Sequence, residues 1–240
     1  MDNPWTNINW ENTVADCDKK VITPDYCEKH GIDISLLPEP YTGNPRSNVV
    51  CLNLNPGIGR CDACFKFNRT LLEETQSTLS HATDHSMWLY GDIKCDKEVL
   101  HEGCEWWRKR TKELREAIFP MPLNMFVIEF FPYHSEHTFN FPKLESDEYR
   151  NYLLTNAIRQ DKLIVIMRGK KKWYDIDQDI KNALKSHEER GRVIEISNPQ
   201  NVSFTKNNLK KNNLKDEEAW NLLVKELSEE ISSKSIAEEL

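Results

Sequence analysis

Val49-Val50-Cys51-Leu52-Asn53-Leu54-Asn55-Pro56-Gly57 is the stretch that decides the fold of this 240-residue chain. An apolar, β-branched run that stops abruptly at Asn-Pro-Gly is typical of a buried strand entering a tight turn. Such a turn leaves the side chain of Asn55 and nearby backbone N–H groups at the carboxyl end of the strand. Because open α/β sheets bind their ligands at that end, the stretch predicts a ligand site as well as a strand.

Three further apolar runs predict strands, and helical spacing of apolar residues predicts helices between them. Nearly continuous apolar strands separated by helices are typical of a parallel sheet that helices cover on both faces. We therefore expect an α/β fold, a three-layer α/β/α sandwich with a four-stranded parallel central sheet. The predicted strands are 48–54, 124–131, 162–167 and 192–197, and the predicted helices are 24–30, 105–118, 147–160, 175–185 and 217–230.

Length and composition favour one domain over residues 1–240. A hydrophobic fraction of 38% beside a charged fraction of 30% argues against disorder of the whole chain. The core of the domain is expected at about 46–204, with a long insertion at 60–103 and an acidic C-terminal helix at 216–240. The polar stretch 207–215 is expected to be a loop or the edge of a helix.

Charge and cysteine content limit the setting of the protein. A net charge of −7 argues against indiscriminate nucleic-acid binding. Lys and Arg nevertheless outnumber Asp and Glu between 161 and 215, which leaves open a basic face or ordinary solvated charges. No long apolar run and no signal-peptide pattern is present, so we expect a cytoplasmic protein that does not bind membranes, with reduced cysteines. The acidic C-terminal helix offers a surface for a protein partner.

The carboxyl ends of parallel strands share one edge of a sheet, so the residues that follow the four strands are expected to form one polar, aromatic rim. These residues are the candidate site. They are Asn53, Asn55, Pro56 and Gly57 after the first strand, Glu129, Tyr133, His134 and Ser135 after the second, Arg168 after the third, and Asn198, Gln200, Asn201, Val202 and Ser203 after the fourth.

Two of these strand ends carry motifs of a known family. They are Asn53-Leu54-Asn55-Pro56-Gly57 and Asn198-Pro199-Gln200-Asn201-Val202-Ser203, each directly after a predicted strand. On these motifs the chain resembles the uracil-DNA glycosylase superfamily, and most closely its mismatch-specific branch, over roughly residues 46–204. The alternative is a chance likeness on a different parallel α/β fold.

The resemblance implies a DNA glycosylase that hydrolyses the N-glycosidic bond of a flipped base without a cofactor. It implies that Asn55 positions the attacking water, that Val202 lies at the tip of a loop inserted into the duplex, and that Glu129 stands where relatives read the base edge. A carboxylate accepts hydrogen bonds but cannot donate them, so Glu129 suits an exocyclic amino group better than uracil. The uracil enzymes carry a His where this chain has Asn198, which also puts strong uracil activity in doubt.

Several candidates have other possible roles. Asn55 could close the strand through an Asx-turn. Glu129 could activate water, or it could be a buried acid paired with Arg168. A glycosylase-like fold could also bind modified nucleic acid or a nucleotide without turnover.

The aromatic residues after the second strand divide into two groups. Phe130 and Phe131 are expected to pack in the core rather than to stack on a base. Tyr133 lies past Pro132 and is expected to face the ligand and stack on it. His134 is the histidine best suited to acid or electrostatic work.

A second signal is Cys61-x2-Cys64 followed by His81-x3-His85. Two thiols and two imidazoles can hold a structural zinc ion, although the gap between the pairs lies slightly outside the usual range. The alternative is an accidental grouping in a cysteine-rich stretch. Bound zinc without nucleic-acid binding would indicate a zinc-stabilised interaction domain.

Overall fold

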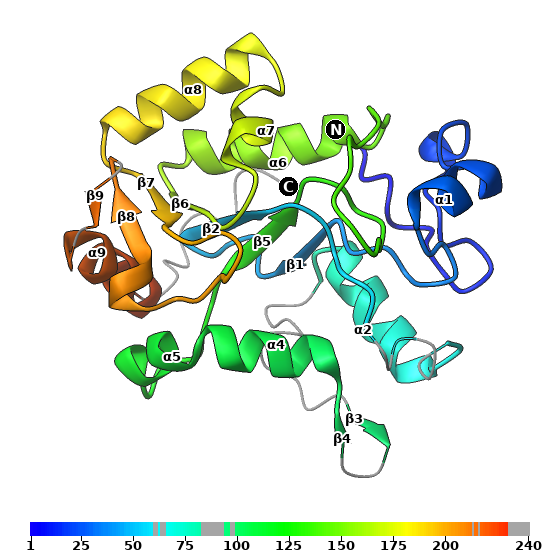
Figure 1. Ribbon diagram of the computed structural model, residues 1–240, viewed down its shortest axis with the longest axis horizontal. Helices are drawn as coiled ribbons and strands as arrows, with labels where there is room; N and C mark the ends of the chain where they lie inside the picture. Colours follow the sequence, from blue (N-terminus) through cyan, green and yellow to red (C-terminus); the bar gives the residue numbers. More distant parts are fainter. Residues whose placement is uncertain are drawn as a thin grey trace.

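The chain forms a mixed β-sheet with helices on both of its faces (Figure 1). The structure is a computed structural model that describes residues 1–59, 62, 66–82, 94–96, 99–212, 214–215 and 217–229. In chain order the elements are η1 (Asp16–Asp18), α1 (Pro24–His30), β1 (Tyr41–Gly43), β2 (Val49–Asn53), α2 (Arg69–Leu79), β3 (Lys94–Asp96), β4 (Val99–Leu100), α4 (Glu102–Arg110), α5 (Lys112–Ile118), β5 (Phe126–Glu129), α6 (Asp147–Arg159), β6 (Leu163–Ile166), α7 (Lys170–Tyr174), α8 (Gln178–Glu189), β7 (Val193–Ile196), η3 (Lys206–Asn208), β8 (Leu209–Lys211), β9 (Leu214–Lys215) and α9 (Glu217–Ser228).

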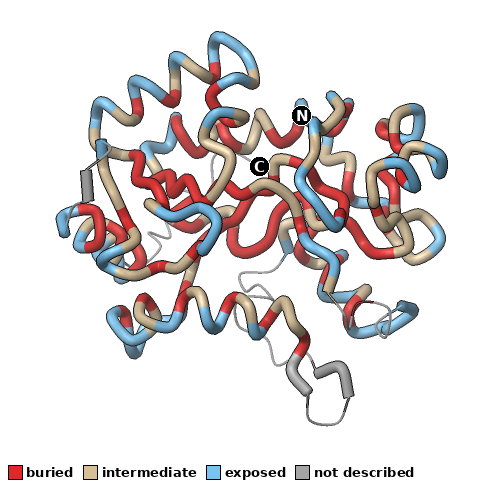
Figure 2. The backbone as a smooth tube through the Cα atoms, viewed as in Figure 1, coloured by how far each residue is buried: buried red, intermediate tan, exposed pale blue. Residues whose placement is uncertain are grey.

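The centre of the sheet consists of the strands that the apolar runs predict. They lie in the order β5, β2, β6, β7, and each pairs in parallel with its neighbour. Every residue of these strands is buried, and Figure 2 shows that buried backbone runs through the middle of the molecule. Because helices cover both faces of the sheet, neither face meets solvent, and apolar and polar residues need not alternate along these strands. The α/β class is confirmed.

The sheet is mixed rather than wholly parallel, because antiparallel strands extend both of its edges. β1 pairs with β5 at one edge, and β8 and β9 continue the sheet beyond β7 at the other. The stretch 207–215, expected to be a loop or a helix edge, contains most of η3 and both of these outer strands, so that expectation was wrong. Strands of two or three residues have no periodic pattern long enough to detect in a sequence.

Two of the expected helices have different bounds in the structure. The helix expected at 105–118 is divided into α4 and α5 at Thr111, whose hydroxyl donates to the carbonyl of Trp107 over 2.6 Å. Such a bond from a Thr side chain to the backbone one turn earlier bends helices. The helix expected at 175–185 starts later, as α8, because the side chain of Asp177 caps it.

The acidic C-terminal helix packs against the sheet through its apolar side. The buried residues of α9 are Ala219, Trp220, Leu223 and Leu227, and Arg192 Nη1 lies 2.6 Å from Glu226 Oε1. The described part of this helix ends at Ser228, short of the expected limit at 240. Among the described helices, none combines the length and the apolarity that a membrane crossing needs.

The direction of the chain connections places a crevice at the end of β2. After β2 the chain passes to α2, α4 and α5 on one face of the sheet, whereas after β5 and β6 it passes to α6, α7 and α8 on the other (Figure 1). Because β5 lies on one side of β2 and β6 on the other, the chain moves along the sheet in one direction from β2 to β5 and in the opposite direction from β5 to β6. Right-handed crossovers in opposite directions place their helices on opposite faces of the sheet. Connections that leave neighbouring strands in opposite directions separate from one another and open a ligand crevice between them.

Candidate functional site

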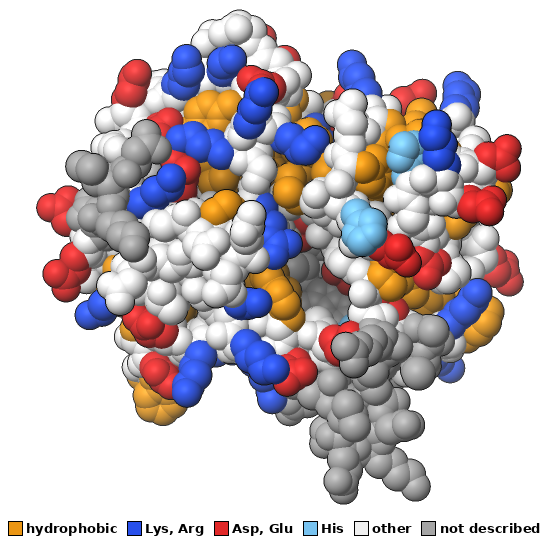
Figure 3. Space-filling view, viewed as in Figure 1, with side chains coloured by type: hydrophobic (Ala, Val, Ile, Leu, Met, Phe, Trp, Pro, Cys, Tyr) orange, Lys and Arg blue, Asp and Glu red, His pale blue; other side chains and the backbone are white. Residues whose placement is uncertain are grey.

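A cavity of about 320 Å³ lies at the carboxyl end of β2, in the range of sites that hold small molecules. Figure 3 shows a hollow near the centre of this face, with basic side chains on one side and acidic side chains on the other. The cavity brings together candidates from three predicted strand ends and adds residues from other segments. The lining includes Asn53, Asn55, Pro56, Gly57, Glu129, His134 and Arg168, together with Glu39, Asp62, His101, Glu102 and Trp106.

Backbone hydrogen bonds continue the pairing of β2 and β5 past the ends of both strands. The N–H of Phe131 donates to the carbonyl of Leu54 over 2.7 Å, and the N–H of Ser135 donates to the carbonyl of Pro56 over 3.2 Å. The two segments therefore leave the sheet side by side. This places the side chain of Asn55 next to Ser135.

Asn55 is held by its amide nitrogen. Nδ2 donates to Ser135 Oγ over 2.9 Å and to the carbonyl of Pro56 over 3.1 Å. The amide oxygen makes no hydrogen bond within the described part of the chain. The side chain thus closes the turn locally and still offers an oxygen that can accept a hydrogen bond from water.

Asn53 and Glu129 form a buried pair at the base of the cavity. Asn53 Nδ2 donates to Glu129 Oε1 over 2.9 Å, while Asn53 Oδ1 and Glu129 Oε2 have no partner among the described residues. Burial raises the pKa of Glu129 to about 8, although the bond from Asn53 lowers it. Glu129 is therefore mostly protonated at neutral pH and can donate a hydrogen bond, contrary to the expectation of a carboxylate that only accepts.

His134 is fixed by the main chain on both sides of its ring. Nδ1 lies 2.6 Å from the carbonyl oxygen of Gly57, and Nε2 lies 3.0 Å from that of Leu37 and 3.6 Å from Glu39 Oε1. Carbonyl oxygens only accept hydrogen bonds, so the imidazolium form satisfies both contacts. His134 can supply positive charge at the cavity wall, but neither of its nitrogens is free to bind a ligand.

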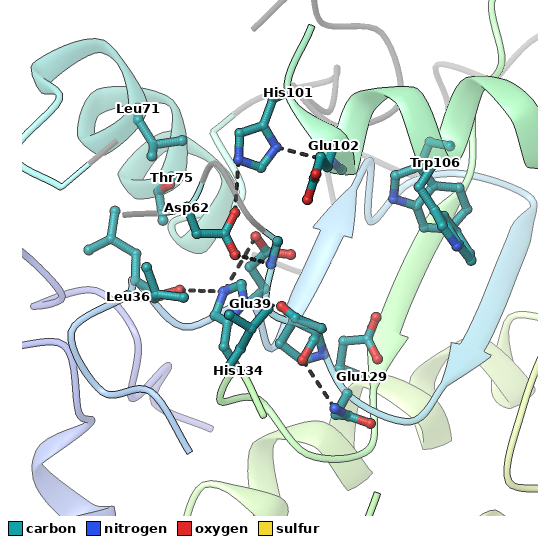
Figure 4. Close-up of a pocket in the computed structure, with 18 of the residues that line it drawn as sticks. Leu36, Glu39, Asp62, Leu71, Thr75, His101, Glu102, Trp106, Glu129 and His134 are labelled. Carbon is teal, nitrogen blue, oxygen red and sulfur yellow. Dashed lines mark hydrogen bonds and ion pairs between the residues drawn. The ribbon is translucent and has the colours of Figure 1, made fainter. Parts of the chain in front are cut away.

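Asp62 and His101 form a second buried pair, and Figure 4 shows Asp62 between His101 and His134. Asp62 Oδ1 lies 2.9 Å from His101 Nε2, and Asp62 Oδ2 accepts from the N–H of Gly59 over 2.6 Å. His101 Nδ1 accepts from the N–H of Gly103, so the neutral ring carries its hydrogen on Nε2. Burial raises the pKa of Asp62, but the hydrogen bonds from His101 and Gly59 outweigh this effect and leave the pKa below its usual value.

The sequence did not predict this second pair. Asp62 stands in the stretch assigned to a long insertion, and His101 is the residue before α4. Nothing in their spacing indicates that they meet. The pair joins the loop after β2 to the start of α4 and so closes one side of the cavity.

The loop that carries Arg168 approaches the end of β2 closely at Gly169. Gly169 has a φ of +69°, and a Cβ there would lie 2.3 Å from Leu54 Cδ2. Gly169→Ala is therefore expected to lower the free energy of unfolding by roughly 1–3 kcal/mol, measured by urea denaturation. Gly57→Ala is the matched control, because a Cβ at Gly57 meets nothing within 4 Å. Equal stability of the two variants would contradict this close approach.

The aromatic residues after β5 lie in the core. Tyr133 is 1% exposed and its hydroxyl donates to Asp18 Oδ2 over 2.8 Å, so the expectation that it faces the ligand was wrong. Core packing is confirmed for Phe131, which is also 1% exposed, and for Phe130, whose ring packs edge-on against Trp173. Residues beyond the strand end point inward here because the segment continues the packing of β5.

The loop after β7 does not line the cavity. Val202 is fully buried, so the expectation that it projects as a duplex-inserting tip was wrong. Asn198 Oδ1 accepts from the N–H of Gln200 over 3.2 Å, and Ser203 Oγ accepts from Asn208 Nδ2 over 3.0 Å. These bonds make a compact turn of the loop.

Of the zinc candidates, His81 lies within the described residues, whereas Cys61, Cys64 and His85 lie outside them. His81 Nε2 lies 2.9 Å from the hydroxyl of Tyr149, and burial lowers the pKa of His81 to about 4. No group of three or more His, Cys, Asp or Glu side chains in the described ranges is arranged to hold a metal ion.

Comparisons of the chain with protein-family models, with curated proteins and with solved structures find no match.

Proposed function

We propose that this protein is a DNA glycosylase-like hydrolase, which takes a flipped base into the cavity at the end of β2 and hydrolyses its N-glycosidic bond. The observation that carries the proposal is the buried pair of Asn53 and Glu129, which leaves two oxygens beside the cavity without a partner among the described residues. Buried polar groups without partners cost free energy, so a ligand that supplies partners is favoured there. The proposal includes the fold: a three-layer α/β/α sandwich of the uracil-DNA glycosylase type.

The pair offers one donor and one acceptor to a base below about pH 8. The proton of Glu129 resides on Oε2, because Oε1 accepts from Asn53, and Asn53 Oδ1 is the acceptor. A donor beside an acceptor matches the N3–H and carbonyl oxygen of uracil or thymine, and also the amino group and N3 of cytosine. The preference for an amino-bearing base, inferred from an ionised Glu129, therefore does not hold at neutral pH, and uracil belongs among the substrates to test.

Asn55 and His134 supply the remaining parts of the reaction. Asn55 holds the attacking water through its amide oxygen, because bond cleavage through an oxocarbenium-like state needs orientation of the water more than its deprotonation. In its imidazolium form, in which both nitrogens donate to carbonyl oxygens, His134 would place positive charge at the cavity wall and stabilise the departing base anion. Neither role requires a cofactor.

The test is an abasic-site assay on duplexes that carry uracil, mismatched thymine or modified cytosines. We expect alkali-labile sites at the altered base in at least one duplex and none in the matched duplex of normal sequence. Absence of cleavage throughout the panel would overturn the enzymatic proposal. Tight binding of an altered base without cleavage would instead support a module that recognises modified nucleic acid.

A further inference from the structure

Arg168 is a half-buried cation at the cavity with unused hydrogen-bonding capacity. Its Nε donates to the carbonyl of Pro199 over 3.1 Å, whereas its two terminal nitrogens have no hydrogen-bond partner among the described residues. Burial lowers the pKa of the Arg168 guanidinium; the carboxyl of Glu129 opposes this shift and the like charge of Arg110 adds to it. The guanidinium remains charged at neutral pH.

The nearby acid does not neutralise this charge at neutral pH. Glu129 interacts electrostatically with Arg168, but burial raises the pKa of Glu129 to about 8 and keeps it mostly protonated. No salt bridge to Arg168 is present in the described part of the chain. One of the expected roles of Glu129 was that of a buried acid paired with Arg168. The described residues show no ion pair between these two side chains.

Arg110, at the end of α4, brings a second guanidinium to the same loop. It donates to the side chain of Asn201, two residues beyond the carbonyl that Arg168 contacts, and lies 5.7 Å from the ring of Trp106. Trp106 lines the cavity. Two like charges held near one another repel, and an anion between them removes the repulsion.

We propose that Arg168 and Arg110 form a phosphate-binding rim that holds a phosphate of the nucleotide whose base occupies the cavity. Guanidinium groups suit this ligand because their planar fork matches phosphate oxygens in two-pronged hydrogen bonds. Trp106, whose ring Arg110 contacts, lines the cavity, and an indole ring is a group on which a neighbouring base can stack. The inference rests on the proposed function and adds to it the element that recognises the backbone.

The first experiment measures binding to a duplex with a tetrahydrofuran abasic analogue, so it does not depend on cleavage or on base identity. Arg168→Gln and Arg110→Gln are each expected to weaken binding roughly 10-fold to 100-fold and to reduce the salt slope by about one. Arg168→Lys should restore part of the affinity. Arg159→Gln, an exposed change on α6, is the matched control and should bind like the wild type.

The second experiment replaces the phosphates around the abasic analogue, one at a time, by neutral methylphosphonates. The wild type should lose affinity at one or two positions, and the double Gln variant should lose nothing further there. Variants that keep the wild-type affinity and salt slope would overturn the rim, as would equal sensitivity of both proteins at every position.

A third arm separates the rim from the glycosylase proposal. It compares 2′-deoxyuridine with its 5′-monophosphate as ligands of the intact protein. Tighter binding of the monophosphate that disappears in Arg168→Gln would support the rim even if no duplex is cleaved. A wild type that prefers neither ligand, and binds no abasic duplex, would overturn it.

Discussion

Asn55→Ala is expected to lower the rate of base removal by at least about 100-fold, the largest effect of any single change at the cavity. The variant loses the amide oxygen that we propose orients the attacking water, while Asn53 and Glu129 still bind the base. Single-turnover cleavage of the best duplex from the panel measures the effect. Binding of the same duplex should change much less than the rate.

The structural role of Asn55 has to be separated from its proposed role in the reaction. Asn55 Nδ2 bonds to Ser135 and Pro56, so Asn55→Ala also loses about 1 kcal/mol of stability per bond. Asn55→Asp keeps an oxygen for the water and is expected to recover part of the rate. Asn182→Ala, an exposed change on α8, is the matched control and should cleave normally. A normal rate in Asn55→Ala would remove Asn55 from the mechanism.

Glu129→Gln is expected to remove a large pH dependence of stability. The pKa of Glu129 is raised from 4.5 in an ordinary setting to about 8 in the folded protein, so between these values the folded state holds a proton that the unfolded chain has lost. The wild-type free energy of unfolding therefore falls as the pH rises through this window, by about 1.4 kcal/mol per pH unit. The fall ends above pH 8, where both states have lost the proton.

Urea denaturation of wild type and Glu129→Gln between pH 5 and pH 9 measures this contribution as a difference. Gln resembles the protonated acid, so the two proteins should be close in stability at pH 5 and diverge by roughly 4 kcal/mol at pH 9. Taking the difference cancels groups such as His81, whose lowered pKa affects stability at the acid end. Glu148→Gln, an exposed change, should run parallel to the wild type. If Glu129→Gln also ran parallel, the acid would be ionised in the folded protein.

The central strands could be predicted from the sequence because burial on both faces leaves long apolar runs such as Val49–Asn53 and Leu163–Ile166. The outer strands could not, because two or three residues carry no period. The division at Thr111 was also hidden, since it depends on a side-chain bond to a backbone carbonyl within a pattern that otherwise reads as one helix.

The candidate site was predictable where strand ends supply it. The parallel order brings Asn53, Asn55, Glu129 and Arg168 to one cavity, as expected for residues at the carboxyl ends of neighbouring parallel strands. Asp62, His101 and Trp106 were not predicted, because their meeting depends on how the segment between β2 and β5 folds back. Tyr133 and Val202 were misplaced because a sequence pattern past a strand end does not show which side chains turn inward.

The strand order also has a consequence for how the protein is made. β2 pairs with β5 on one edge and with β6 on the other, and both partners follow it in the chain. During synthesis, an apolar strand with two open edges therefore leaves the ribosome well before either neighbour, and such edges are prone to intermolecular pairing. A chain that stops before β6 keeps one edge of its central strand uncovered and lacks Arg168, so nascent fragments are expected to depend on chaperones until the third of the four central strands is complete.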